Sequence, residues 1–286
     1  MNTSKPDPHA LVKGLTKVAS LPSIFSKVEE ALANPKSSNK LLADILSEDT
    51  ALSARLLRLA NSAFYNFPGK VDTITQAIIV IGTHQLRDVV LASCVVSAFK
   101  DIPDDIVNMD SFWRHSIACG VTCRILATLR RDPNIETAFL SGLLHDIGSL
   151  VLYKMKPEEM GILLSHYQES KQLLFKLERE HFGFDHALLG GLLLKEWELP
   201  ERHQETTTYH HSPGQSKIYP LETAMVHISD IIANAVIDGS SGERIIPPLN
   251  PTTWEKLGLN DSSASFIINE LNNQFSIAVS FVSEDT

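Results

Sequence analysis

Apolar residues recur at helical spacing along most of this chain, and this pattern restricts it to a fold built from helices. In residues 38–48, Leu41, Leu42, Ile45 and Leu46 share one face after a Ser-Ser-Asn start signal. The same spacing predicts helices at about 50–61, 112–130, 134–150, 157–168, 171–181, 184–197, 199–208, 219–237 and 262–278. Because no series of alternating strands interrupts these segments, we predict an all-α fold.

One apolar run fits a helix and a strand equally well. Residues 78–82 read Ile-Ile-Val-Ile-Gly, which a short buried strand would also satisfy. However, Asp72 and Thr73 are residue types that cap helices, and the apolar pattern beyond Gly82 continues at helical spacing. We therefore predict a helix, a break at Gly82 and a second helix.

The chain is long for one compact core and comfortable for two lobes. The acidic segment 101–110 contains a proline and lacks periodicity, so it marks a boundary, and residues 238–253 are expected to form a loop. We expect an N-terminal extension at 1–20, one helical lobe at 21–104, a second at 105–240, and a C-terminal loop and helix at 241–286.

The charge balance disfavours nucleic acid as a partner. The chain has a formal net charge of -9; residues 13–100 hold 10 Lys and Arg against 7 Asp and Glu (+3), and the remainder holds 15 against 27 (-12). The helices at 38–48 and 50–61 have the short link of a helix-turn-helix. The second helix offers only Arg55 and Arg58 as basic residues, so we favour an ordinary antiparallel pair.

Cysteine usage and hydropathy indicate a soluble protein in a reducing compartment. Cys94, Cys119 and Cys123 form no C-x-x-C pair, and we expect buried thiols. The N-terminus has no apolar core of a signal peptide, and no segment reaches the roughly 18 uninterrupted apolar residues of a membrane span. We expect a cytoplasmic protein that contacts no membrane.

His145 and Asp146 are the first candidates for chemistry. They lie between Leu143-Leu144 and Ile147, an apolar setting in which a carboxylate is costly unless it is paired or holds a metal ion. A metal ion needs a neutral imidazole and an ionised carboxylate, which this pair supplies. A structural hydrogen-bonded pair is the alternative.

Other polar residues in apolar helical settings strengthen the metal interpretation. His186 begins a face of small residues, including Gly190 and Gly191, which lets another helix approach closely. Each such histidine or aspartate alone is more often structural than functional. The further candidate ligands are His115, His186, His210, His211 and Asp230.

The order of these residues resembles that of the HD phosphohydrolase superfamily, in the variant with a His-His pair found in HD-GYP phosphodiesterases. The stretches LPSIFSKVEEAL, EDTALSARLLRLANSAFYNFPGKVDTITQAIIVIG, AFLSGLLHDIGSLVL and DHALLGGLLLKEWELPE resemble a neighbouring branch, the HD-related output domain or HDOD. This resemblance runs from about Leu21 to about Val236. It implies a two-lobed helical bundle, with an HDOD lobe at 21–104 and an HD-like lobe at 105–240, and a role in bacterial signal transduction.

The resemblance also implies a ligand set. His115, His145, Asp146 and Asp230 would hold one divalent ion. Asp146 would bridge to a second ion, whose other ligands would be His186, His210 and His211. Mixed imidazole and carboxylate ligands suit Fe, Mn, Zn or Ni better than Ca.

The chain departs from the pattern of active HD-GYP enzymes in two places. Their HDIGK motif carries a lysine that would contact the substrate phosphate, and Ser149 stands at that position. Where their Gly-Tyr-Pro loop would follow the His-His pair, this chain reads Ser212-Pro213-Gly214-Gln215. We therefore expect a non-catalytic output module that keeps its metal site and acts on a signalling protein partner. The alternative is a metal-dependent phosphohydrolase that takes a phosphate ester as its ligand and depends on Asp146 for catalysis.

Overall fold

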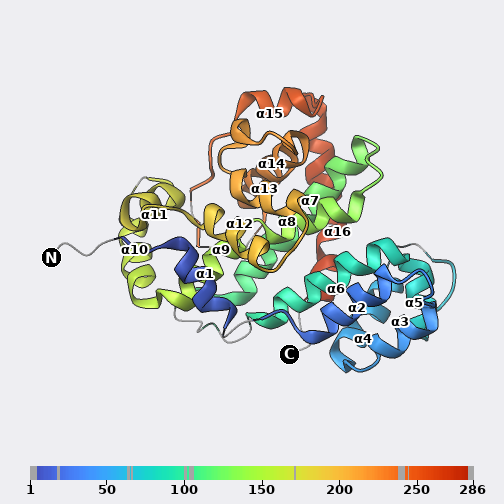
Figure 1. Cartoon of the computed structure of the whole chain (residues 1–286). Coiled ribbons are helices and arrows are strands. Elements are labelled where there is room, and N and C mark those ends of the chain that lie inside the picture. Colours follow the sequence, from blue (N-terminus) through green and yellow to red (C-terminus); the bar gives the residue numbers. More distant parts are fainter. Residues whose placement is uncertain are drawn as a thin grey trace. The chain divides into compact units, whose positions relative to one another are not determined.

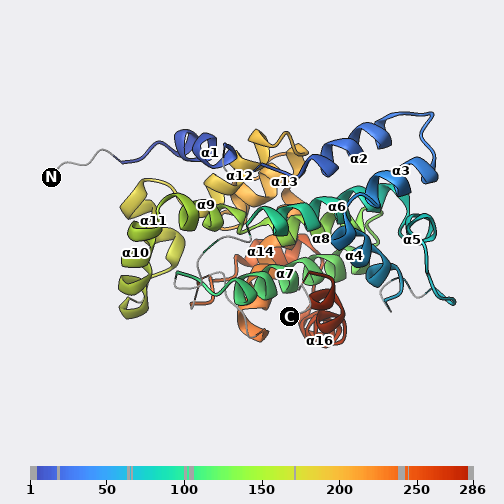
Figure 2. The same cartoon turned by 90° about the horizontal axis from the view of Figure 1, so that it is seen from below.

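All regular structure in the described part of the chain is helical, which confirms the all-α prediction. The computed structural model describes residues 5–17, 20–62, 65, 67–99, 102, 106–170, 172–237, 242–243 and 245–282. The helices form two compact units (Figures 1 and 2), one made of residues 21–100 and 274–286 and the other of residues 1–20 and 101–273.

The smaller unit is a set of short capped helices. The side chains of Ser38 and Asp49 cap the starts of two helices by accepting hydrogen bonds from the backbone N–H groups of Leu41 and Leu52. Arg55 is buried, so one of the two basic residues on the second of these helices faces the core. The helices are α2 (Ser23–Ala33), α3 (Asn39–Leu46), α4 (Thr50–Ala60), α5 (Ile74–Ile81) and α6 (Thr83–Ala98), with the end of α16 (Asp261–Val282).

The ambiguous run at 78–82 belongs to a helix that ends where the sequence predicts. Thr73 and Gln76 form a reciprocal capping box at the start of α5. Gly82 has φ of 86°, a left-handed value that favours glycine and ends α5 before α6 begins at Thr83. The predicted helix, break and helix are confirmed.

The larger unit has its core around α7, α8, α9, α12, α13 and α14. In this core α7 packs against α8 and α14, and α12 packs against α9 and α13, while α1 also contacts α9 and α12. Its helices are α1 (Pro8–Thr16), α7 (Met109–Leu129), α8 (Ile135–Leu144), α9 (Ile147–Met155), α10 (Pro157–Glu169), α11 (Leu174–Phe182), α12 (His186–Glu196), α13 (Glu201–Tyr209), α14 (Pro220–Val236), α15 (Pro251–Lys256) and the first part of α16.

The single helix predicted at 134–150 is wrong, because the chain breaks at the two polar residues within it. Helix α8 ends at Leu144 and α9 begins at Ile147. His145 instead turns its Nδ1 atom toward the carbonyl oxygen of Gly142, at 2.7 Å. The run 135–155 has the length and composition to cross a membrane, but 72% of its apolar 18-residue window is buried within the protein, as in the core of a soluble protein.

Helices α9 and α12 approach each other closely through glycine. A Cβ atom added at Gly148 would lie 1.9 Å from the backbone oxygen of His186 and 2.5 Å from the backbone nitrogen of Gly190. The close approach expected of the small-residue face on α12 is therefore present, and it sets the distance between the turn at 145–146 and the start of α12.

A single carboxylate oxygen organises the chain between α13 and α14. Oε1 of Glu205 accepts hydrogen bonds from the Ser216 hydroxyl and from the backbone N–H groups of Lys217, Ile218 and Tyr219, at 2.6, 2.6, 2.9 and 3.4 Å. Burial opposes the charged form, but these donors outweigh it and lower the pKa of Glu205. The segment that follows the His-His pair is therefore held as one turn.

Replacing Glu205 with glutamine is expected to destabilise the protein by about 1 kcal/mol at pH 7, because a neutral amide oxygen accepts these bonds more weakly. Because the pKa of Glu205 is lowered on folding, its ionised carboxylate contributes its full stabilisation above the ordinary pKa of 4.5. This stabilisation is lost as the pH falls through the lower pKa of the folded state. Urea unfolding of the wild type and of Glu205→Gln at several pH values should show a difference in the free energy of unfolding that becomes smaller below pH 4.5. The exposed Glu196→Gln change is the control, and an equal difference at all pH values would contradict the prediction.

Candidate metal centre

The structure brings all seven predicted ligand residues together inside the larger unit. They come from α7, the α8–α9 turn, the start of α12, the end of α13 and the middle of α14. Six of them are no more than 3% exposed, and only His211 is half-buried. The seven are His115, His145, Asp146, His186, His210, His211 and Asp230.

One half of the cluster contains two histidines and two carboxylates. Nε2 of His115 lies 3.3 Å from Nε2 of His145 and 3.3 Å from Oδ1 of Asp230. Nε2 of His145 lies 3.2 Å from Oδ2 of Asp146 and 3.6 Å from Oδ1 of Asp230. These four side chains therefore direct two nitrogens and two oxygens at one point.

The other half contains three histidines. Nε2 of His211 lies 2.9 Å from Nε2 of His186 and 3.0 Å from Nε2 of His210. Oδ1 of Asp146 lies 3.3 Å from His186 and 3.6 Å from His210, again at Nε2. Asp146 thus stands between the halves, with one oxygen turned to each.

Hydrogen bonds at the opposite ring nitrogens fix how three of the histidines face the cluster. Nδ1 of His145 donates to the Gly142 carbonyl and Nδ1 of His210 to the Thr207 carbonyl, both at 2.7 Å. Nδ1 of His186 lies 2.7 Å from the Glu178 carboxylate. A neutral imidazole that carries its proton on Nδ1 leaves Nε2 as a bare lone pair. In their neutral forms, these three rings would therefore direct three lone pairs into the cluster.

The charges in the cluster divide the histidines into two kinds. Burial lowers the pKa of His145 and His186, but Asp146 and the neighbouring acids Asp230 and Glu178 outweigh it and raise both pKa values well above 6.5. Burial and the charge of His145 instead lower the pKa of His210 to about 4. His211 has a pKa well below its ordinary value for similar reasons. Burial favours the neutral form of Asp146 and Asp230, but the neighbouring histidines outweigh it and hold the pKa values of both carboxyl groups well below their usual range.

A metal cation fits this donor set. Ring nitrogens that face one another at 2.9–3.3 Å repel unless a proton or a cation lies between them. Buried polar atoms are nearly always satisfied, yet Oδ2 of Asp230 has no hydrogen-bond partner. Imidazole nitrogens and carboxylate oxygens are the ligands that first-row divalent metals share. Two triads, His115 with His145 and Asp146, and His186 with His210 and His211, have the spacing to hold an ion.

Metal binding is expected to release protons at pH 7, because an ion must displace the protons on His145 and His186. The aspartates are already ionised and His210 and His211 already neutral, so they release none. Affinity should therefore rise with pH. Isothermal titration calorimetry in two buffers of different ionisation enthalpy measures the proton count, and a count of zero would contradict the prediction.

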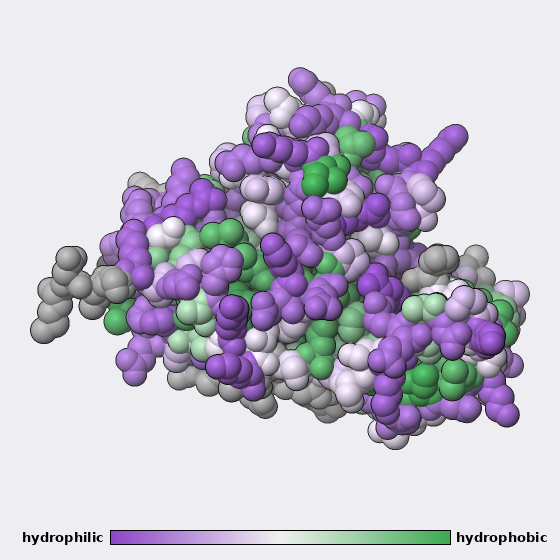
Figure 3. Space-filling model, in the orientation of Figure 1, coloured by the Kyte–Doolittle hydropathy of each residue, from purple (hydrophilic) through white to green (hydrophobic). Residues whose placement is uncertain are grey.

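The cluster is largely shielded from bulk solvent, with His211 as its partly exposed member. Ser149, at the position of the HD-GYP lysine, is 1% exposed. His211, the most accessible ligand, has its ring stacked on Phe175, with ring centroids 4.2 Å apart and planes at 17°. The face in Figure 3 is mostly hydrophilic, with its apolar side chains in small patches.

Two acids beside the cluster were missed by the sequence interpretation. Glu178 lies on α11 and contacts His186. Glu243 is buried, and burial together with the charges of Asp230 and Asp146 raises its pKa well above the ordinary value. Glu178 follows Leu174 and precedes Phe182 by four residues each, so a charge on an apolar helix face was the signal for it. Glu243 lies in the expected loop at 238–253, where no periodicity marks it.

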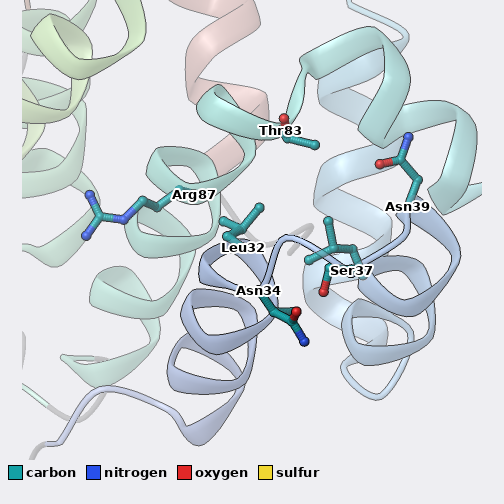
Figure 4. A pocket seen from close by; sticks show the side chains of 8 residues that line it. Leu32, Asn34, Ser37, Asn39, Thr83 and Arg87 are labelled. Carbon is teal, nitrogen blue, oxygen red and sulfur yellow. The ribbon is translucent and has the colours of Figure 1, made fainter.

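A pocket of about 260 Å³ lies in the smaller unit, far along the chain from these ligands. Residues of α2, α3 and α6 line it, and Figure 4 shows the Arg87 guanidinium pointing away from Asn39 and Thr83. Arg87 is paired with Glu29 through two hydrogen bonds. Its charge is therefore already neutralised, and the pocket offers less chemistry than the buried cluster.

Comparison with known proteins identifies the family of this chain. The HDOD domain family model matches residues 18–213. This chain belongs to the HDOD family.

Solved structures share the fold over nearly the whole chain. An HDOD domain protein from Geobacter sulfurreducens is 24% identical, with a TM-score of 0.77 and 97% of each chain covered. A candidate phosphohydrolase from Shewanella amazonensis SB2B is 25% identical, with a TM-score of 0.74 and 95% of this chain and 96% of that chain covered. An uncharacterised protein from Treponema pallidum (strain Nichols) is 26% identical over 197 residues, which are 68% of this chain and 38% of that protein. This chain therefore spans little more than a third of the length of the Treponema pallidum protein.

Proposed function

We propose that this protein is a signalling output module of the HDOD family that holds a divalent metal ion without turning over a substrate. The observation that carries the proposal is the combination of a complete ligand cluster with its burial. Six of the seven ligand residues are no more than 3% exposed, so an ion would be shielded from a phosphate ester in solution. A metal ion in such a site would stabilise one conformation of the protein, and a partner protein would recognise that conformation.

The residues around the cluster support a non-catalytic role. Ser149 supplies no cation to neutralise a substrate phosphate, and its buried hydroxyl lies on the first turn of α9. The segment after His211 forms a short 3-10 turn at Pro213–Gln215 in place of a Gly-Tyr-Pro loop. Both features remove groups that would bind a cyclic dinucleotide.

The ligand types favour a first-row transition metal. His115, His145, Asp146 and Asp230 would hold one ion, and a second would take His186, His210 and His211 with the other oxygen of Asp146. This set suits Fe, Mn, Zn or Ni. When bound, the ion would neutralise the two aspartates and act as a Lewis acid toward any oxygen ligand that reached it.

The second candidate function is a metal-dependent phosphohydrolase. The position of Asp146 favours it, because its two oxygens face the two halves of the cluster and it could help to hold two ions, which would supply an activated water for attack on phosphorus. The similarity to the candidate phosphohydrolase from Shewanella amazonensis supports the same possibility. In this function a phosphate ester would be the substrate and Asp146 would be essential.

Metal analysis combined with activity assays tests the proposal. We expect the purified full chain to carry metal by elemental analysis. We also expect it to leave phosphomonoesters, phosphodiesters and cyclic dinucleotides intact when Fe or Mn is added. Turnover that disappears in Asp146→Ala would overturn the non-catalytic role in favour of the hydrolase. A wild-type protein that binds no metal would overturn both.

A further inference from the structure

We infer that Glu178 is a positioning residue that makes His186 a stronger metal ligand; this inference rests on the proposed metal site. The carboxylate lies on α11, outside the seven ligand residues, and is fully buried. Its Oε2 atom accepts two hydrogen bonds from one residue, at 2.9 Å from the backbone N–H of His186 and at 2.7 Å from its Nδ1. Glu178 thus contacts Nδ1 of the His186 imidazole, while Nε2 of the same ring faces Asp146 and His211.

Capping of α12 accounts for only one of these two hydrogen bonds, the one from the backbone N–H of His186. Asp185 already caps that helix, since its side chain accepts from the backbone N–H of Leu188 at 2.9 Å. Asp185 is itself paired with Arg179, with Nε and Oδ2 2.7 Å apart. Glu178 therefore adds one hydrogen bond at the start of α12, at the backbone N–H of His186, and its other hydrogen bond goes to the imidazole of the same residue.

The contact has a definite chemical effect on His186. A carboxylate that accepts from Nδ1 keeps the proton there, so Nε2 presents its lone pair to the cluster. The negative charge also makes the ring more basic and a better electron donor to an ion. Carboxylate–histidine–metal arrangements owe part of their affinity to this outer group, and its loss typically costs about 10–100-fold in metal affinity.

His186 differs from the other ligand histidines in its partner at Nδ1. Nδ1 of His145 and Nδ1 of His210 donate to neutral backbone carbonyls, those of Gly142 and Thr207. Of the ligand histidines in the described part of the chain, only His186 has a carboxylate at its Nδ1 atom. Glu178 should therefore matter most to an ion held by the three-histidine half, and little to one held by His115 and His145.

The experiment is a zinc titration of the full-length protein against a chromophoric chelator, after removal of bound metal. The variants are Glu178→Gln, which keeps the side-chain size, His186→Ala, the double variant, and Glu180→Gln. Glu180 is exposed two residues away on α11 and serves as the matched control. We expect Glu178→Gln to weaken zinc binding about 10–100-fold and Glu180→Gln to leave it unchanged. In the His186→Ala background, Glu178→Gln should have less than about a twofold further effect, because Glu178 acts through that ring.

A second readout needs no metal. In proton NMR spectra of the metal-free protein, Nδ1–H of His186 should give a slowly exchanging, strongly downfield resonance that is absent from Glu178→Gln. Absence of that resonance from the wild type would overturn the inference. Equal zinc affinity in wild type and Glu178→Gln, or an undiminished effect in the His186→Ala background, would also overturn it while leaving the metal site intact. A wild-type protein that binds no zinc or other divalent metal would instead overturn the proposed function itself.

Discussion

Replacing Asp146 with asparagine is expected to yield a folded protein that no longer holds metal in either half of the cluster. One Asp146 oxygen faces His115 and His145 and the other faces His186 and His210, so one substitution weakens both halves. Asparagine keeps the shape but removes the charge that offsets the cation. Since the loss of groups behind the ligands already costs about 10–100-fold, the loss of a shared ligand should exceed about 100-fold in affinity. Elemental analysis and a zinc titration measure the effect.

The fold should survive this change because asparagine keeps the side-chain shape, and because Asp146 is one of the acids that raise the pKa values of His145 and His186, so both rings lose protons more readily without it. Circular dichroism of metal-free wild type and variant should therefore agree. Asp110→Asn, at an exposed position in the first turn of α7, is the control and should keep wild-type metal content. Full metal content in Asp146→Asn would show that the cluster does not bind metal through this carboxylate.

Replacing Gly148 with alanine is expected to cause the largest loss of stability, about 3 kcal/mol or more. The new Cβ would lie 1.9 Å from the backbone oxygen of His186, and backbone cannot move aside as a flexible side chain can. Helices α9 and α12 must separate, which carries Asp146 away from His186. Thermal unfolding should show a melting temperature lower by about 6–12 °C, together with reduced metal content.

Gly161→Ala is the matched control for this substitution. Gly161 lies within α10, and a Cβ there would meet nothing within 4 Å. Alanine favours a helix interior over glycine by about 1 kcal/mol, so this variant should be as stable as the wild type or slightly more stable. A Gly148→Ala protein with wild-type melting temperature would mean that α9 and α12 pack less closely than described.

Much of the fold follows from local rules that act on neighbouring residues. Helical spacing predicts the all-α fold, and cap residues with Gly82 predict the break between α5 and α6. The break at His145 is different, because the apolar spacing continues through it. Its cause lies in contacts with α7, α12 and α14, which draw both polar side chains into one cluster.

The candidate site was predictable where a polar residue contradicts its apolar surroundings. Asp230 on α14 and His115 on α7 are of this kind, and the resemblance to HD proteins supplied the order that links them. Glu178 carries the same local signal, but nothing in the sequence pairs it with His186. Glu205 gives no such signal, since its four donors lie 11 to 14 residues later in a turn without periodicity.

Burial of the cluster also determines how fast an ion can enter or leave. Because six of the seven ligand residues are no more than 3% exposed, an ion would enter or leave mainly when the surrounding helices open locally. Exchange would then proceed at the rate of that opening, whatever the affinity of the site. A chain that acquires its ion while folding would keep that ion when the supply of metal later changes. Its metal content would then reflect the metal that was available during folding.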